Sequence, residues 1–283
     1  MASTVTRVHQ ASVSDAPRLL RLLDTAARHF TSVGREDLRY LLSQDRVWLA
    51  DGDDRLSGFL CVTPRSSPAA DLRALALING WSADAGVQAL LEPVIGDLKD
   101  VHVTELVCLS GHPWLRLPLQ RSGFDLVDGI VYFERTPCGG FAAVPNGETV
   151  LRSARGHDLP TLLELDSQAF ETLWRFDRGH FMELMVTSEH CMVAEQAGRA
   201  VGYAITDLRG DAGFIVRLAV HPDRQGQGIG SLLLEDALSY CHTAGAAVVR
   251  LNTQESNAAS HQLYLRYSFR RWGRRVPVFV KQL

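Results

Sequence analysis

Three glycines at alternate positions stand where a helix is expected to begin. Gly226, Gly228 and Gly230 lie between the apolar run "RLAV" and the amphipathic run "SLLLEDAL". Glycine weakens helices and strands alike, so three in this place need a physical reason. The first amides of a helix have no internal partner and lie at the positive end of the helix dipole. A loop without side chains lets phosphate oxygens reach those amides, so the stretch predicts a diphosphate site.

Two common phosphate-binding loops fit this stretch poorly. The loop of nucleotide hydrolases ends in Gly-Lys-Ser/Thr, whereas Gly230 is followed directly by Ser231. The dinucleotide-binding loop has the spacing Gly-x-Gly-x-x-Gly and an acidic residue about 20 residues later, and this chain has neither. A plain strand-to-helix turn accounts for one glycine more readily than for three.

A third kind of loop fits, and a second segment supports it. "QGQGIG" at 225–230 satisfies the pattern Gln/Arg-x-x-Gly-x-Gly/Ala and follows "RLAVHPDR". Further along, "RLNTQESNAASHQLYLRYSF" supplies Asn257, Tyr264 and Phe269, with Ser268 in place of the usual glycine. Together the two segments resemble the acetyl-CoA site of the GNAT acyltransferase superfamily. The loop is also similar to that of the ribosomal-protein N-terminal alanine acetyltransferases.

The resemblance implies an acetyl-CoA-dependent N-acetyltransferase in which an amine attacks the acetyl group directly. The backbone of one splayed strand would pair with the pantetheine arm and polarise the thioester carbonyl, and the loop would hold the diphosphate. The residues implied for coenzyme binding are Leu218, Ala219, Val220, Gln225, Gly226, Gln227, Gly228, Ile229, Gly230, Ser231 and Asn257. No metal is expected.

Two of the implied residues have an alternative interpretation. Tyr264 would protonate the departing thiolate, since a phenol with a pKa near 10 suits a thiol with a pKa near 8.5. A tyrosine on an amphipathic helix is also typical of a core. Asn257 would contact the coenzyme or serve only as a helix cap.

The sequence leaves more than one candidate for the general base. In the ribosomal-protein acetyltransferases a Glu lies five residues before the Asn, but here Asn252 stands there and cannot act as a base. Glu255 and His221 lie nearby in the sequence, and a water relay without a single base is the alternative. Asn252 also favours a second class of function, a coenzyme-binding sensor or scaffold that transfers nothing.

Two further segments are candidates for acceptor or coenzyme contacts. The resemblance implies that 170–181 covers the acceptor cleft, with Trp174, Phe176, Asp177 and His180 lining it, unless the aromatic side chains are core. Residues 266–275 contain five arginines that could meet coenzyme phosphates, an acidic acceptor or RNA. A solvated hairpin fits better, because the chain carries a net charge of −3.

Periodicity predicts the elements that position these residues. We expect helices over 158–171, 230–243 and 257–267. We expect strands over 190–195, 200–207, 213–220, 246–254 and 275–282. The resulting class is α/β (α+β), with a mixed twisted sheet flanked by helices.

Three pairs of segments repeat at nearly one spacing. "SDAPRLLRLLDTAA" at 14–27 resembles "HDLPTLLELDSQAF" at 157–170, and two later pairs match Gly58 with Gly202 and Phe124 with Phe269. The offsets of 143 to 145 residues predict two tandem domains of one fold, over 1–137 and 148–283, joined by the Gly- and Pro-rich stretch 136–148.

The first copy departs from the pattern that carries the chemistry. The offset places Leu75, Ala76 and Leu77 opposite Leu218, Ala219 and Val220. It also places the acidic Asp84 where a diphosphate would bind, and Leu119 opposite Tyr264. We therefore expect the first domain to bind no coenzyme.

The composition indicates the cellular location and the class of partner. The five cysteines are scattered and odd in number, which is typical of reduced, mostly buried thiols and indicates a cytoplasmic protein. No apolar run approaches the roughly 18 residues of a membrane span. We expect a monomer or homodimer that acts on a small-molecule or peptide amine, without nucleic acid or membrane partners.

Overall fold

Contacts divide the chain into two compact units, each with its own run of neighbouring strands. The computed structural model describes residues 7–44, 46–52, 55–65, 68–136 and 148–283. The first unit comprises Met1–Gly129 with Val276–Leu283, and the second comprises Ile130–Arg275. The units are thus not sequential halves, whereas the sequence repeat predicts sequential domains. Most of the predicted joint, residues 137–147, lies outside the described residues.

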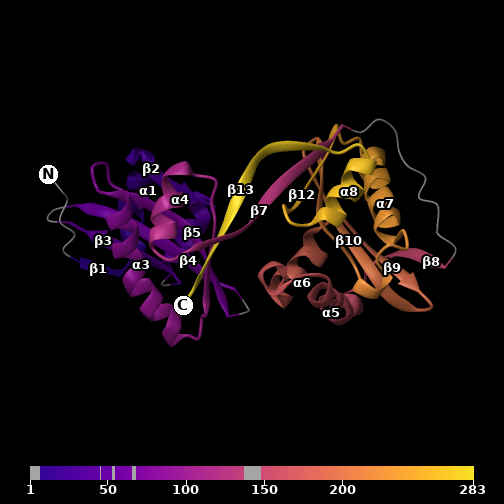
Figure 1. Cartoon of the computed structure of the whole chain (residues 1–283), viewed down its shortest axis with the longest axis horizontal. Coiled ribbons are helices and arrows are strands. Elements are labelled where there is room, and N and C mark those ends of the chain that lie inside the picture. The colour runs from indigo at the N-terminus through magenta and orange to yellow at the C-terminus, as the bar shows by residue number, and fades with distance from the viewer. Residues whose placement is uncertain (1–6, 45, 53–54, 66–67, 137–147) are drawn as a thin grey trace. The chain divides into compact units, whose positions relative to one another are not determined.

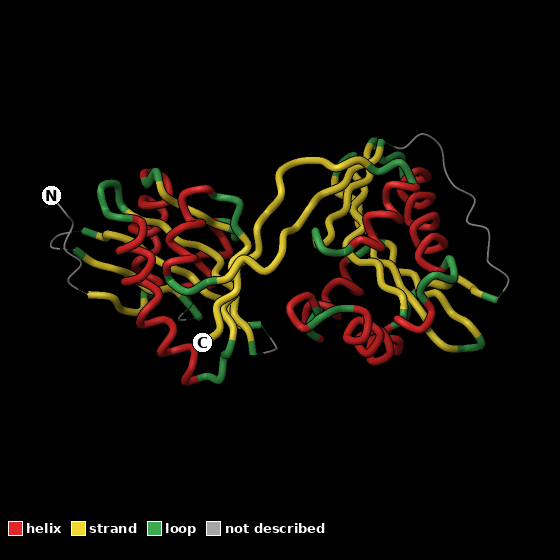
Figure 2. The backbone as a smooth tube through the Cα atoms, viewed as in Figure 1, coloured by secondary structure: helices red, strands yellow, loops and turns green. Residues whose placement is uncertain are grey.

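The first unit is a mixed sheet with helices packed on it (Figures 1 and 2). Its strands run in the order β1-β3-β4-β5-β6, followed by the end of β13, and β2 pairs with β5. The strands are β1 (Arg7–Gln10), β2 (Arg28–Thr31), β3 (Val47–Asp51), β4 (Leu56–Pro64), β5 (Ala69–Leu77) and β6 (Glu105–Leu109). The helices are α1 (Ala16–Thr25), α2 (Arg35–Leu42), α3 (Ala83–Asp100) and α4 (Pro113–Arg121).

The second unit repeats this plan. Its strands run in the order β7-β12-β11-β10-β9-β8. They are β7 (Asp125–Arg135), β8 (Thr149–Ser153), β9 (His190–Gln196), β10 (Arg199–Arg209), β11 (Ala212–Val220) and β12 (Val248–Gln254). The helices are α5 (Leu159–Ala169), α6 (Arg178–Thr187), α7 (Ile229–Thr243) and α8 (Ala258–Arg266), and the last strand is β13 (Arg270–Gln282).

Helices cover both faces of the second sheet, because its central strands are apolar on both sides. On one face Tyr203 and Ala219 pack with α5 and α6. On the other face Ala204 and Val220 pack with α7. Figure 1 shows α5 and α6 on one side of these strands and α7 and α8 on the other.

One glycine in each unit permits the same close approach. A Cβ at Gly202 of β10 would lie 2.9 Å from the carbonyl oxygen of Ala219, and close to α7. A Cβ at Gly58 of β4 would lie 2.9 Å from the carbonyl oxygen of Ala76. These two glycines are one of the repeated pairs, so the repeat has a packing reason at this position.

The strands β11 and β12 are paired over only part of their length. The parallel register joins Ala212–Ile215 of β11 to Val248–Leu251 of β12. Beyond Ile215, β11 continues to Val220 and, within the described ranges, pairs there only with β10. The separation coincides with a β-bulge: Ile205 of β10 faces Arg217, and the next residue, Thr206, faces Ile215. The bulge redirects β11 and opens the sheet at this point.

Each unit is completed by a strand from the far part of the chain. In the first unit, the end of β13 pairs antiparallel with β6, with Phe279 opposite Cys108. In the second unit, the end of β7 pairs antiparallel with β12, with Phe133 opposite Leu251. Both inserted phenylalanines are 1% exposed and belong to the core of the unit that receives them.

All the elements predicted for the second half are present, with ends shifted by a few residues. The sequence analysis missed α6 and β8. The last strand begins at Arg270 rather than 275, and its end lies in the first unit. Cys61, Cys108 and Cys241 are buried free thiols and Cys191 is half-buried, whereas Cys138 lies outside the described residues. Within the described part of the chain, we find no helix whose length and hydrophobicity would suit a membrane span.

We predict that Phe279→Ala destabilises the first unit, although the residue lies near the C-terminus. Truncating a fully buried phenylalanine costs about 3–5 kcal/mol. Urea denaturation should show the lower free energy of unfolding. Hydrogen exchange of the native protein should show that the amides of β6 lose protection. Gln282→Ala, on the same strand but exposed, should change the free energy of unfolding by less than about 0.5 kcal/mol. Lost protection confined to the second unit would contradict the strand assignment.

Candidate functional site

The loop between β11 and α7 needs two of its glycines for backbone reasons. Gly226 has a φ of +75° and Gly228 a φ of +84°, in the left-handed region that other residues avoid. Gly228 is the N-cap of α7, and its carbonyl oxygen accepts the Leu232 amide at 3.0 Å. The helix therefore begins at Ile229, one residue before the predicted start.

The third glycine has no such requirement. Gly230 lies inside the first turn of α7, and a Cβ there would meet Leu263, Val220 and Leu218 at ordinary distances of 3.6–3.9 Å. The protein itself would accept alanine at this position. The amides of Ile229, Gly230 and Ser231 precede the first internal bond of the helix, so they are the ones that an α-helix leaves for an outside acceptor. Small residues at the mouth of α7 leave room for that acceptor.

The polar side chains of the loop bond mainly to the loop itself. The Nε2 of Gln225 donates to the carbonyl oxygen of Val220 at 3.2 Å, which holds the loop to the end of β11. The Nε2 of Gln227 donates to the carbonyl oxygen of Asp223 at 3.3 Å. The two glutamines thus leave the main chain of the glycine stretch accessible to an anion.

The strand residues Leu218, Ala219 and Val220 lie on the part of β11 that β12 does not pair. Their opposite edge is paired with Ala204, Tyr203 and Gly202 of β10. The Ala219 and Val220 side chains are buried, and Leu218 is half-buried. Among the residues that the structure describes, no strand pairs with the main chain that faces the opening, and this edge leads directly to the mouth of α7.

Asn257 and Tyr264 lie on α8, which packs beside α7. The Oδ1 of Asn257 accepts the Ser260 amide at 3.0 Å, so its capping role is present. Tyr264 is 6% exposed and packs between Phe133 and Phe269. Burial raises the pKa of Tyr264 to about 12, and a hydrogen bond with the Ser260 side chain opposes that rise. The phenol therefore keeps its proton at neutral pH, as a proton donor must.

Glu255 and His221, the two side chains considered as general bases, already interact with other groups. Glu255 forms an ion pair with Arg275. The Nδ1 of His221 accepts the Asp223 amide at 3.2 Å, so the lone pair of a neutral imidazole is engaged in a loop hydrogen bond. Asn252 is exposed on β12.

The segment expected at the acceptor side is ordered by its own contacts. The Oδ1 of Asp177 accepts the His180 amide at 2.8 Å and caps α6. Phe176 packs edge-on against His180 and Phe181. Trp174 is half-buried and ends a short 3₁₀ turn, Thr172–Trp174. Asp177 thus has a structural role that the sequence analysis did not foresee.

The sequence analysis also missed a buried polar cluster. Asp166 of α5 is 1% exposed and accepts hydrogen bonds from the Tyr203 hydroxyl and from Arg217 of β11. Burial raises the pKa of Tyr203 well above its ordinary value. A signal was present: Arg217 is the one charged residue in the apolar strand "GFIVRLAV", and buried charges require partners.

In the first unit, the edge of β5 that corresponds to the open edge of β11 is covered by another strand, β2. The strand β2 pairs antiparallel with β5, joining Arg28–Thr31 to Ala74–Leu77. That stretch contains Leu75, Ala76 and Leu77, which the repeat places opposite the open edge of β11. The parallel pairing of β5 with β6 covers only Ala69–Asp71. The first sheet therefore separates in the same way, but β2 fills the separation.

The loop that follows β5 also differs. It spans 78–82 and contains one glycine, Gly80, and the buried side chain of Trp81. The guanidinium of Arg28 donates to the carbonyl oxygen of Trp81 at 2.9 Å, which ties β2 to the loop. Asp84, in the first turn of α3, pairs with Arg121. The mouth of α3 is thus closed by an indole and a carboxylate.

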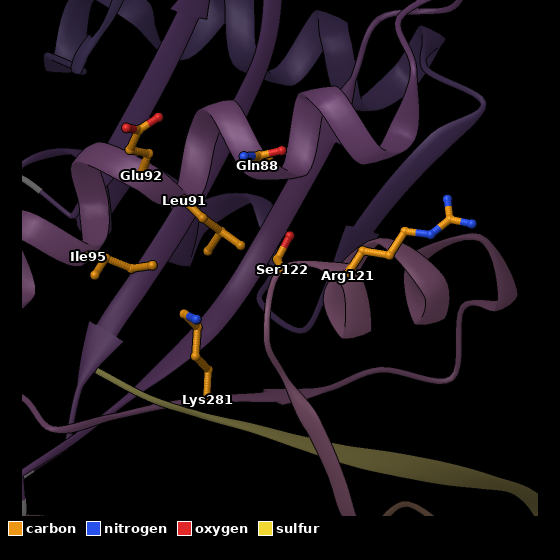
Figure 3. Close-up of a pocket in the computed structure, with 7 residues that line it drawn as sticks. All are labelled: Gln88, Leu91, Glu92, Ile95, Arg121, Ser122 and Lys281. Carbon is orange, nitrogen blue, oxygen red and sulfur yellow. The ribbon is translucent and has the colours of Figure 1, made fainter.

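The first unit also has a pocket of about 330 Å³, and none of its lining residues belongs to either loop (Figure 3). Its walls come from α3, the end of α4 and the end of β13, and its lining residues are Gln88, Leu91, Glu92, Ile95, Arg121, Ser122 and Lys281. Figure 3 shows the Arg121 guanidinium directed away from the other side chains, in keeping with its pairing to Asp84. The pocket therefore does not coincide with the predicted site. Among the described residues, no group of three His, Cys, Asp or Glu side chains has the arrangement of a metal site.

Comparison with known families agrees with the geometry of the second unit. Residues 151–269 match the description "Acetyltransferase (GNAT) family". This region is similar to the GNAT family. The match includes the glycine loop, the separated strands and α8, so the resemblance and the mixed α/β fold predicted from the sequence are confirmed. The match and the relatives, which are named as N-acetyltransferases, support an acyltransferase.

Individual relatives support the same assignment. A putative ribosomal protein bS18-alanine N-acetyltransferase of Bacillus subtilis is 25% identical over 126 residues, which cover 44% of this chain and 83% of the relative. A GCN5-related N-acetyltransferase from Sphaerobacter thermophilus shares the fold over 98% of this chain and 95% of its own, with a TM-score of 0.69 and 16% identity. A tandem GNAT protein from the clavulanic acid biosynthesis pathway, solved without AcCoA, aligns over 98% of both chains with a TM-score of 0.62 and 15% identity.

We predict that alanine has opposite effects at two positions of the glycine loop. Gly228→Ala forces an L-residue into the left-handed region and should lower the free energy of unfolding by about 1–2 kcal/mol. Gly230→Ala should be neutral or stabilising by up to about 1 kcal/mol, because alanine favours a helix. Urea denaturation of both variants measures the difference. Equal destabilisation would mean that Gly230 is also required by the fold.

Proposed function

We propose that the second unit is an acetyl-CoA-dependent N-acetyltransferase that moves an acetyl group to a primary amine. The observation that carries the proposal is the unpaired edge of β11 leading directly to the open mouth of α7. The edge offers main-chain partners to an extended amide-containing arm, and the helix mouth offers amides to a diphosphate. Acetyl-CoA combines both features in one molecule.

The donor set fits this cosubstrate. Gly226, Gly228 and Gly230 leave the main chain accessible, and the side chains of Gln225 and Gln227 stabilise the loop rather than compete for the anion. The main chain of Leu218, Ala219 and Val220 would hold the pantetheine arm and polarise the carbonyl that is attacked. The bound thioester supplies the acetyl group.

Tyr264 is proposed as the general acid. The amine nitrogen forms the new C–N bond as the C–S bond breaks, and the leaving sulfur receives the proton of the Tyr264 hydroxyl. The nitrogen loses its own extra proton to water, and a proton from water restores the phenol. A phenol with a pKa of about 12 is fully protonated at neutral pH and gives up its proton only as negative charge develops on the sulfur. Burial between two phenylalanines fixes the ring, and Ser260 orients the hydroxyl.

We propose that the proton of the acceptor ammonium leaves through water. Glu255 and His221 are committed to an ion pair and to a loop hydrogen bond, and Asn252 is not basic. A primary amine is the acceptor class that this chemistry needs. The bS18-alanine acetyltransferases among the relatives are named for a protein amine, so a peptide with a free N-terminal alanine is one reasonable probe alongside small primary amines.

We propose that the first unit binds no coenzyme. The strand β2 occupies the main-chain edge of β5 that would have to receive the pantetheine arm. Trp81 and Asp84 obstruct the equivalent helix mouth, by bulk and by negative charge. The first unit would therefore support the second rather than carry out a second transfer.

We expect Tyr264→Phe to lower the turnover number at least tenfold while the dissociation constant for acetyl-CoA stays within threefold. Release of free thiol measures turnover, and calorimetry measures binding. Because the pKa of Tyr264 is about 12, the ratio of wild-type to variant turnover should stay constant from pH 7 to 10. Tyr240→Phe, a half-buried tyrosine near the C-terminal end of α7 whose hydroxyl donates to Glu189, is the matched control. Unchanged turnover in Tyr264→Phe would remove this residue from the mechanism.

We expect one molecule of acetyl-CoA to bind per chain. Calorimetry of the full chain should give a stoichiometry near one, because β2 blocks the equivalent edge of the first unit. Gly230→Glu, which adds an acid at the mouth of α7, should abolish the binding isotherm. Binding that persists in this variant would have to come from a second site and would contradict the proposal for the first unit.

A further inference from the structure

The β-bulge in β11 determines which face of the second sheet Arg217 occupies. Side chains of a regular strand alternate, but Val216 and Arg217 both lie on the face covered by α5 and α6. The following residue, Leu218, packs with the α7 side. Without the extra residue, Arg217 would point to the opposite face. The bulge therefore places a cation under α5 at the point where β11 and β12 separate.

Arg217 is engaged on every side by the segment that follows α5. Its Nε donates to Asp166 at 2.9 Å, and a terminal nitrogen donates to the carbonyl oxygen of Trp174 at 2.8 Å. Its guanidinium lies between two aromatic rings, 3.5 Å from the centre of Phe170 and 3.9 Å from that of Phe176. Asp166 in turn accepts the Phe176 amide at 3.0 Å. Residues 170–176 are thus anchored to β11 at both ends and in the middle.

The position of this segment gives the anchor a functional meaning. In the proposed function, the coenzyme enters the opening from the α7 face, because its diphosphate binds at the mouth of α7. The amine must then reach the thioester carbon from the opposite face, where α5, α6 and residues 170–176 lie. A wall on that side has to be held in place for the amine to meet the carbonyl in a productive geometry.

We propose that Arg217 is a positioning residue that fixes residues 170–176 as the acceptor-side wall of the cleft. The inference rests on the proposed function and adds to it a determinant of acceptor binding. Arg217 acts through Trp174, Phe176 and Asp166 and does not itself touch the reacting atoms. The planar guanidinium is required, since only a flat cation can lie between two rings and donate to two acceptors at the same time.

The test compares Arg217→Lys with the wild-type full chain. Lysine keeps the charge that Asp166 needs but loses the planar contact and the fork of donors. Kinetics are measured with acetyl-CoA and with a peptide bearing a free N-terminal alanine or a panel of small primary amines. We expect the KM for the amine to rise at least fivefold, the KM for acetyl-CoA to stay within twofold, and hydrogen exchange of residues 170–176 to become at least tenfold faster.

Two further variants complete the design. Phe176→Leu removes one ring but leaves the Asp166–Arg217 pair, and it should shift the KM for the amine in the same direction. Arg209→Lys makes the same substitution at an exposed arginine that stacks on Phe214 at the far end of β10. It should change neither the KM for the amine nor the hydrogen exchange of residues 170–176.

The possible outcomes separate the two proposals. If the wild-type chain transfers acetyl to none of the amines, the proposed function fails and this inference falls with it. If the wild type is active but Arg217→Lys leaves the KM for the amine unchanged, the inference is overturned while the function stands, whether or not exchange becomes faster. An equal loss of acetyl-CoA binding in Arg217→Lys would also overturn it, because the defect would then be a general one.

Discussion

The incomplete pairing of β11 with β12 is the constraint on which the second unit depends. A parallel pair normally satisfies both strands along their length, whereas here the register ends at Ile215 and Leu251. Unpaired main-chain groups are costly when they are removed from water without a partner. The second unit keeps this opening next to a helix mouth, and glycines stand at 226, 228 and 230 where the loop meets α7. The opening, the loop and the start of α7 therefore act as one structural feature.

Both units have the same separation between two parallel strands, but the units differ in what pairs with the strand edge exposed there. In the first unit, β2 supplies the missing main-chain partners of β5, and Arg28 fastens it to the loop that carries Trp81. In the second unit, no described strand takes that place on β11. In the first unit the edge is satisfied by the chain itself, while in the second it is the edge at which we propose that acetyl-CoA binds. The difference comes from a few residues between α1 and α2, far from the segments that carry sequence similarity to the family.

Much of the second unit could be predicted because its signals are local. The glycine loop, the cap at Asn257 and the apolar strands are each defined by neighbouring residues, and the structure agrees with them. The bulge at Val216, the burial of Asp166 and the pairing of β2 with β5 depend on contacts between distant segments. In the sequence, the sign of this buried cluster is that Arg217 is a single charged residue in an apolar strand. The positive φ of Gly226 and Gly228 explains two glycines, while the third is explained only by the space it leaves.

The exchange of strands between the two units has a consequence for biosynthesis. The first sheet lacks its edge partner for β6 until residues 276–282 have been synthesised, and these follow β6 by more than half of the chain. An emerging chain therefore holds an incomplete first unit while the whole second unit is translated. Vectorial folding, one module at a time, cannot complete the first core. For the same reason, neither half of the repeat can be transferred to another protein as a contiguous segment without losing a strand from its sheet.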